Sequence, residues 1–172
     1  MNVPGRLGAV MYVVASVLAI ALLTALFHDA IEHQRNPNES PQSVATDDGR
    51  VSIVLERNRS GHYVFDGFVN GAPVEFLLDT GATDVSVPEA VANRLRLPRG
   101  ARLRAVTANG ITTAFATTID SLAVGALEET NIRASIVPNL PGEQILLGMS
   151  FLKRLDFSQR GDTLILSQRR PR

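Results

Sequence analysis

One carboxylate in this sequence stands where an apolar run ends and a tight turn begins. Asp79 follows the segment Phe-Leu-Leu at 76–78, and Thr80 and Gly81 complete an Asp-Thr-Gly turn. A carboxylate at such a point can act as a general base that takes a proton from water, or as the acid that returns one. The tripeptide also arises by chance in about 3 to 5% of chains of this length and makes an ordinary turn, so alone it is moderate evidence.

The composition removes most other kinds of catalytic centre. The 172 residues include no cysteine and three histidines, His28, His33 and His62. This excludes a disulfide scaffold, a thiolate zinc site and a cysteine nucleophile, and it argues against a histidine metal centre or a Ser-His triad. The 17 basic and 17 acidic side chains balance, which argues against binding to nucleic acid. No ligand cluster or Gly-rich phosphate loop is visible, so we expect neither a metal nor a cofactor.

A second motif lies about 65 residues beyond the first. Leu146, Leu147 and Gly148 end an apolar run that enters a predicted short helix. Together the two motifs resemble the retropepsin-like aspartic proteases (clan AA), and more closely the membrane-anchored bacterial members of that group. The resemblance covers residues 51–167. It implies an all-β, single-lobe acid protease domain with one or two short helices, preceded by a transmembrane helix.

The resemblance also implies roles for particular residues. Asp79 corresponds to the catalytic aspartate, with Thr80 and Gly81 supporting its loop, and Leu146, Leu147 and Gly148 correspond to the strand that passes beside that loop. The hairpin 105–111 corresponds to the flap that closes over substrate. The implied substrate-binding residues are Ala82, Thr83 and Asp84 after the signature and Thr107, Ala108, Asn109 and Gly110 in the flap. Retroviral enzymes usually carry two aspartates after Gly-Ala, whereas this chain has Thr83 and Asp84, which leaves its specificity open.

A single Asp-Thr-Gly loop predicts that two chains are needed. Metal-free peptide hydrolysis uses two close carboxylates that share one proton, because their like charges resist simultaneous ionisation. Asp66-Gly67 lacks the threonine, and Asp47-Asp48-Gly49 lies in a polar segment. We therefore expect a symmetric homodimer in which two Asp79 carboxylates face each other and a protein or peptide is the substrate.

The sequence around these motifs predicts mostly short strands. Alternating or β-branched runs predict strands at 51–56, 62–69, 73–79, 102–107, 111–117, 120–124, 131–137 and 163–167. Asn70-Gly71 and Asn109-Gly110 are typical hairpin turns. A Ser-Val-Pro-Glu capping box at 86–89 predicts a helix through residue 95, and a second helix is predicted at 149–155.

An uncharged apolar run precedes this domain. Residues 8–27 could form a helix of about 30 Å, the thickness of a bilayer core. The alternative is a cleaved signal peptide, but the run is long and ends without an Ala-x-Ala site. We expect a tail (1–7), an anchor (8–27), a flexible stalk (28–50), the protease domain (51–167) and a basic tail (168–172). Arg6 favours a single-pass inner-membrane protein with a periplasmic or other extracytoplasmic domain.

Two other functions stay open from the sequence. One is a catalytically silent, membrane-tethered module that binds extended peptides or assembles a complex. The other is an anchored domain in which Asp79 is only a structural turn residue. Loss of activity in an Asp79→Asn variant separates the enzyme from both.

Overall fold

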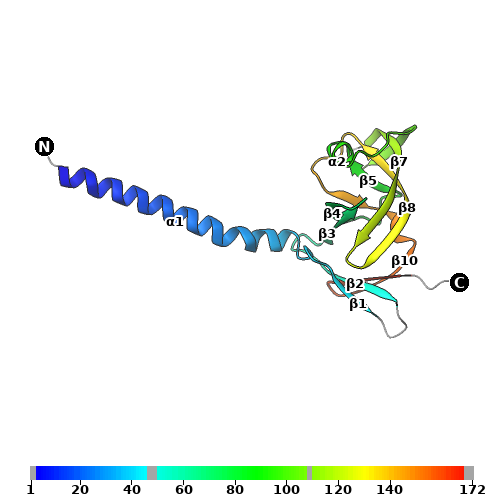
Figure 1. Cartoon of the computed structure of the whole chain (residues 1–172), viewed down its shortest axis with the longest axis horizontal. Coiled ribbons are helices and arrows are strands. Elements are labelled where there is room, and N and C mark those ends of the chain that lie inside the picture. Colours follow the sequence, from blue (N-terminus) through cyan, green and yellow to red (C-terminus); the bar gives the residue numbers. More distant parts are fainter. Residues whose placement is uncertain (1–2, 46–49, 108–109, 169–172) are drawn as a thin grey trace.

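A long helix leads into a domain built almost entirely of strands (Figure 1). The computed structural model describes residues 3–45, 50–107 and 110–168. Helix α1 spans Val3–Arg35. Its segment Gly8–Arg35 is long and apolar enough to cross a membrane, and its most apolar stretch is not buried against the domain.

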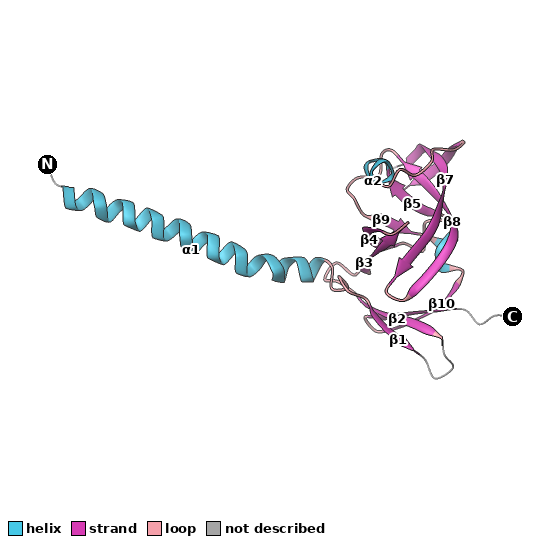
Figure 2. Cartoon of the chain, viewed as in Figure 1, coloured by secondary structure: helices cyan, strands magenta, loops and turns pink. Residues whose placement is uncertain are grey.

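The strands form two sheets. Figure 2 colours all strands magenta and the helices cyan. The smaller sheet has the order β1-β2-β11-β10, and the larger has the order β3-β4-β9-β5-β8-β7-β6 with a further pairing of β3 to β7. The strands are β1 (Gln42–Ala45), β2 (Val51–Glu56), β3 (Val64–Val69), β4 (Ala72–Leu78), β5 (Val85–Pro88), β6 (Arg102–Thr107), β7 (Gly110–Val124), β8 (Leu127–Val137), β9 (Ile145–Leu147), β10 (Leu155–Arg160) and β11 (Thr163–Gln168). Two short helices, α2 (Glu89–Arg94) and α3 (Met149–Leu152), complete the domain.

The core is aliphatic with a few phenylalanines, as the low aromatic content indicates. Phe65 on β3 and Phe76 on β4 are fully buried, and their ring centroids are 5.6 Å apart. Inward side chains of β2 and β11, including Ile53 and Leu166, join the same cluster. The core therefore packs against the end of β4 that leads to Asp79.

The all-β prediction is confirmed, and several of its details are wrong. β7 is one continuous strand where two were predicted, and the helix predicted at 149–155 ends at Leu152. Strand β10 was not predicted, because it is exposed along most of its length and lacks the alternation of a half-buried strand. The capping box at 86–89 is also wrong. Ser86 lies in β5, and Pro88 occupies the N-cap of α2 without a side-chain hydrogen bond.

The described part of the segment expected to be a flexible stalk, residues 28–45, instead continues α1 or is fixed to the domain. α1 continues to Arg35, and β1 pairs with β2, so the ordered domain begins well before residue 51. Asn36 and Asn38 are buried, with 2% and 5% exposure. The Asn38 amide donates to the carbonyls of Glu56 and Val64, and its Oδ1 accepts from the Glu56 N–H at 2.7 Å. A polar run of this kind resembles a linker in sequence because the strands that satisfy its amides are distant in the chain.

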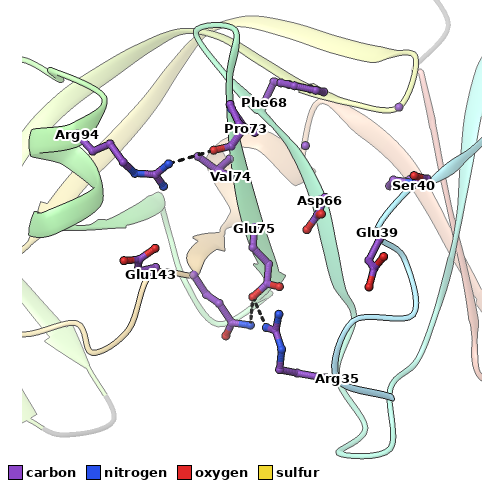
Figure 3. A pocket seen from close by; sticks show the side chains of 14 residues that line it. Arg35, Glu39, Ser40, Asp66, Phe68, Pro73, Val74, Glu75, Arg94 and Glu143 are labelled. Atoms are coloured by element: carbon purple, nitrogen blue, oxygen red, sulfur yellow. Dashed lines mark hydrogen bonds and ion pairs between the residues drawn. The ribbon is translucent and has the colours of Figure 1, made fainter. Parts of the chain in front are cut away.

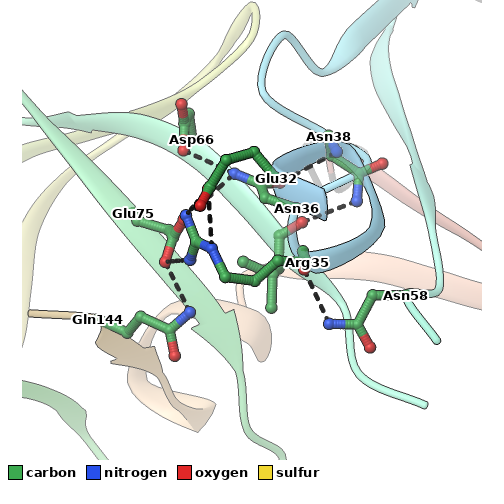
Figure 4. A network of polar contacts seen from close by, with 9 residues as sticks. Glu32, Arg35, Asn36, Asn38, Asn58, Asp66, Glu75 and Gln144 are labelled. Carbon is green, nitrogen blue, oxygen red and sulfur yellow. Dashed lines mark hydrogen bonds and ion pairs between the residues drawn. The ribbon is translucent and has the colours of Figure 1, made fainter. Parts of the chain in front are cut away.

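Charged side chains extend this connection between α1 and the larger sheet (Figure 4). Arg35 forms ion pairs with Glu32 on its own helix and with Glu75 on β4, at 2.9 and 2.6 Å. The Asn36 amide donates to Asp66 on β3 at 2.8 Å. The contacts of Arg35, Asn36 and Asn38, here called the helix–domain joint, fix the end of α1 against the domain.

Candidate active site

The Asp79 loop (residues 79–84) crosses over a strand that belongs to a distant part of the chain. β4 and β5 are consecutive in sequence, yet β9 lies between them in the sheet. β9 runs parallel to β4, with Leu78 opposite Leu147, and pairs antiparallel with β5 through Ser86 and Leu146. The loop that joins β4 to β5 must therefore pass over the end of β9, where Gly148 lies.

Backbone hydrogen bonds shape the turn that carries Asp79. The Asp79 N–H donates to Leu147 O at 3.2 Å, which ties the start of the loop to β9. The Gly81 N–H donates to Asp79 Oδ1 at 2.9 Å, and the Ala82 N–H donates to Asp79 O at 3.2 Å. A Cβ at position 81 would lie 3.1 Å from Asp79 Oδ1, so a side chain there would press against the carboxylate. The carboxylate is thus oriented by its own loop and remains partly exposed to solvent.

Gly148 allows the two crossing segments to touch. A Cβ added at this position would lie 2.7 Å from Ala82 O and would collide with Asp84 O as well. The next residue completes the contact, since the Met149 N–H donates to Ala82 O at 2.8 Å. The predicted placement of Leu146, Leu147 and Gly148 beside the Asp79 loop agrees with these contacts.

Two further residues brace the far end of the loop, and the sequence did not point to either. Arg133 Nε on β8 donates to Asp84 Oδ1 at 2.6 Å. Ser150 is 3% exposed; its Oγ accepts from the Val85 N–H at 3.0 Å and donates to Arg133 O at 2.7 Å. No local pattern signals these pairings, because Asp84 and Arg133 are brought together by the parallel pairing of β5 with β8.

Thr80 and Thr83 are exposed on the Asp79 loop, and Ala82 is partly buried. A small hollow of about 170 Å³ opens beside Thr80. Its walls include Leu164 and Leu166 of β11 and Phe157 of β10, and the Phe157 side chain is half exposed. The surface next to the candidate catalytic carboxylate is therefore partly apolar and open.

The predicted flap hairpin is formed by β6 and β7. The two strands pair antiparallel along their length, from Arg102 opposite Phe115 to Thr107 opposite Gly110. Gly110 has a φ of 107°, a conformation that favours glycine. The predicted tip residues Ala108 and Asn109 lie outside the described residues.

A larger hollow lies away from Asp79. It measures about 820 Å³ and lies beside the helix–domain joint (Figure 3). Its lining includes Asp66, Glu75 and Glu143, but no residue of the Asp79 loop. Burial raises the pKa of Asp66 above its ordinary value, and the negative charge of the neighbouring Glu75 carboxylate raises it further. The hydrogen bond from Asn36 opposes this rise. No group of three or more potential metal ligands occurs among the described residues.

Comparison with known families bears on the domain that carries the Asp79 loop. Residues 65–154 match the model of the family described as "gag-polyprotein putative aspartyl protease". The chain belongs to the retropepsin-like aspartic protease family. The match covers just over half of the chain and contains both the Asp79 loop and Gly148. The retropepsin-like fold expected from the two motifs is confirmed.

A solved structure supports this assignment, and two curated proteins are also similar to this chain in sequence. A crystal structure of a retropepsin-like aspartic protease from Rickettsia conorii is 31% identical, with a TM-score of 0.58, and the match covers 75% of this chain and 94% of that one. An uncharacterised protein from the cobV 5′ region of Sinorhizobium sp is 31% identical over 72% of this chain, and the uncharacterised protein RP867 of Rickettsia prowazekii is 32% identical over 67%. The chain spans about half the length of these two curated relatives, 55% and 51%.

Proposed function

We propose that this retropepsin-like chain is a membrane-anchored aspartic endopeptidase whose active site forms between the Asp79 carboxylates of two copies. The observation that carries the proposal is the position of Asp79. Its carboxylate is partly exposed and is oriented by the Gly81 N–H. The loop that carries it is hydrogen-bonded to β9. The Asp-Thr-Gly signature occurs once in the sequence, so each chain supplies half of the dyad.

The chemistry follows from two carboxyl groups that hold one proton between them. The ionised carboxylate takes a proton from water as the water oxygen bonds to the scissile carbonyl carbon, and the protonated one donates its proton to the carbonyl oxygen. The resulting tetrahedral diol collapses when a proton passes from a diol hydroxyl through the dyad to the amide nitrogen and the C–N bond breaks. The products are a carboxylic acid and an amine, and the dyad again holds one proton.

The surface around Asp79 is suited to a second copy. Thr80 is exposed at the rim of the apolar hollow lined by Phe157 and Leu164, so a chain that brings its own Asp79 close would cover apolar area there. We assign Thr80 and Gly81 to the contact between the two loops. Such an interface is isologous, with the same surface contributed by both copies.

Substrate is proposed to lie between the Asp79 loop and the flap as an extended strand, with backbone hydrogen bonds giving affinity and apolar pockets giving selectivity. Ala82, Thr83 and the flap residues 107–110 are the proposed contacts. The ion pair with Arg133 favours a bracing role for Asp84 over the substrate contact expected from the sequence.

The N-terminal helix is proposed to be a retained anchor with the domain on the extracytoplasmic side. α1 continues beyond the apolar run to Arg35 and is joined to the domain through Asn36 and Asn38. Cleavage as a signal peptide would cut a helix that is continuous with this joint. Anchoring also concentrates chains in the plane of the membrane, which favours pairing.

Inhibitor stoichiometry tests the half-site and separates it from a catalytically silent module. A pepstatin-type peptide carries a hydroxyl that takes the place of the attacking water between two carboxylates. Calorimetric titration of the full chain in detergent should give one inhibitor bound for every two chains. A ratio of one inhibitor per chain would contradict the shared site. Affinity that is unchanged when the central hydroxyl is removed would indicate a silent binding module.

A further inference from the structure

An arginine-rich stretch stands apart from the proposed active site. Residues 94–104, here called the arginine segment, read Arg-Leu-Arg-Leu-Pro-Arg-Gly-Ala-Arg-Leu-Arg. They contain five of the 17 basic side chains and no acidic one, in a chain whose formal net charge is zero. The segment begins at the last residue of α2 and runs into β6.

The five arginines of the segment are exposed, and among the described residues only Arg99 forms an ion pair with a carboxylate. Arg99 pairs with Glu89 and lies 4.1 Å from the ring centroid of Phe115, which Arg102 also approaches at 6.0 Å. Within the described residues, Arg96, Arg102 and Arg104 form no ion pair with a carboxylate. Stacking on Phe115 leaves the edges of a guanidinium available to anionic oxygens. The segment is therefore a surface of net positive charge held on a folded scaffold.

The helix–domain joint determines which way this surface points. Because Arg35, Asn36 and Asn38 fix the end of α1 against β3 and β4, the domain has a defined orientation relative to the helix. In Figure 1, α2 lies at the edge of the domain that faces back along α1 toward the N-terminus. If residues 8–27 span the bilayer, residues 28–35 add about 12 Å of helix beyond it. The start of the arginine segment then lies on the side of the domain that faces the membrane.

We propose that the arginine segment binds the anionic lipid headgroups of the membrane that α1 spans. The inference rests on the proposed membrane anchor and is independent of catalysis. An anionic surface attracts each nearby arginine appreciably, and the guanidinium fork matches phosphate oxygens. Leu103, which is 39% exposed, lies among these arginines and adds apolar surface to the contact. Because β6 is one strand of the flap hairpin, lipid binding would hold the base of that hairpin at the membrane.

The absence of native cysteine allows a direct test with the full chain in nanodiscs. Ala101→Cys places a single fluorophore in the arginine segment, and Ser158→Cys places one on β10 as a matched exposed control. Headgroup-attached nitroxide lipids then report proximity by quenching. Discs of phosphatidylcholine are compared with discs in which phosphatidylglycerol replaces a third of the lipid. We expect quenching at position 101, but not at 158, to rise in the anionic discs and to fall again in high salt.

Arginine substitutions provide the second part of this quenching experiment. Arg96→Gln with Arg104→Gln removes two arginines that form no ion pair among the described residues. Each arginine near an anionic surface contributes about fivefold, so the double substitution should lower the ratio of docked to undocked domain about 30-fold. Asp79→Asn should leave the quenching unchanged. Equal quenching in both lipids, or quenching unaffected by the double substitution, would overturn the proposal. So would a double variant that docks normally but binds acidic peptides more weakly, which would assign the segment to substrate. Loss of the chain from the discs in high salt would instead contradict the anchor.

Discussion

Replacing Asp79 by asparagine is expected to abolish peptide hydrolysis, with a loss of at least about 10³-fold in kcat/KM. The amide is nearly isosteric and can still accept the Gly81 N–H through its oxygen, so the loop should keep its shape. It cannot take a proton from water at neutral or mildly acidic pH. The rate of cleavage of a fluorogenic peptide mixture, measured beside the thermal midpoint of unfolding, checks both parts of this expectation.

Asp162→Asn is the matched control for this substitution. Asp162 is an exposed carboxylate in the turn between β10 and β11, and it pairs with Arg57 across the surface. Its replacement should change neither hydrolysis nor stability measurably, because exposed ion pairs contribute little. Full activity in the Asp79 variant would remove that carboxylate from the mechanism and favour the reading in which it is a structural turn residue.

Gly148→Ala is expected to have the largest effect on stability of any single methyl addition near the site. The new Cβ would collide with the carbonyl oxygens of Ala82 and Asp84, which are backbone atoms and cannot rotate away. We expect a loss of about 3 kcal/mol or more in the free energy of unfolding. The displaced Asp79 loop should also lower kcat at least about 100-fold in molecules that remain folded.

Gly142→Ala is a suitable comparison for this glycine. Gly142 has a φ of 78° and open space around its Cα, so alanine there should cost about 1 to 2 kcal/mol through backbone conformation alone. Urea unfolding of both variants, followed by circular dichroism, measures the difference. Similar stability of the two variants would show that β9 and the Asp79 loop are not packed as closely as described.

The local pattern of the sequence predicted several strands of the domain. Residues 51–56 and 102–107 form strands with the predicted bounds, because β-branched alternation and flanking turn residues determine them locally. The proximity of Asp79 to Gly148 did not follow from periodicity. It was expected only because two motifs together resembled a known family.

Contacts made by polar side chains over long sequence separations were not predictable. Arg133 and Asp84 are 49 residues apart, and nothing in either neighbourhood indicates their ion pair. Asn36 and Asn38 resembled linker residues because their composition is polar, yet each is buried and hydrogen-bonded to the larger sheet or to β2. Burial of an amide depends on which carbonyls the fold presents to it, and this information is absent from a local window.

The measurement that tests the shared active site most directly is subunit mixing. Wild-type chains are combined in detergent with about a ninefold excess of Asp79→Asn chains, and exchange is verified by pull-down of differently tagged copies. If each site needs one Asp79 from each of two chains, the activity of the fixed amount of wild-type chain should fall to about one-tenth, because most wild-type chains then pair with a variant. Activity that stays unchanged while the tags show full exchange would mean that one chain suffices, and it would contradict the account.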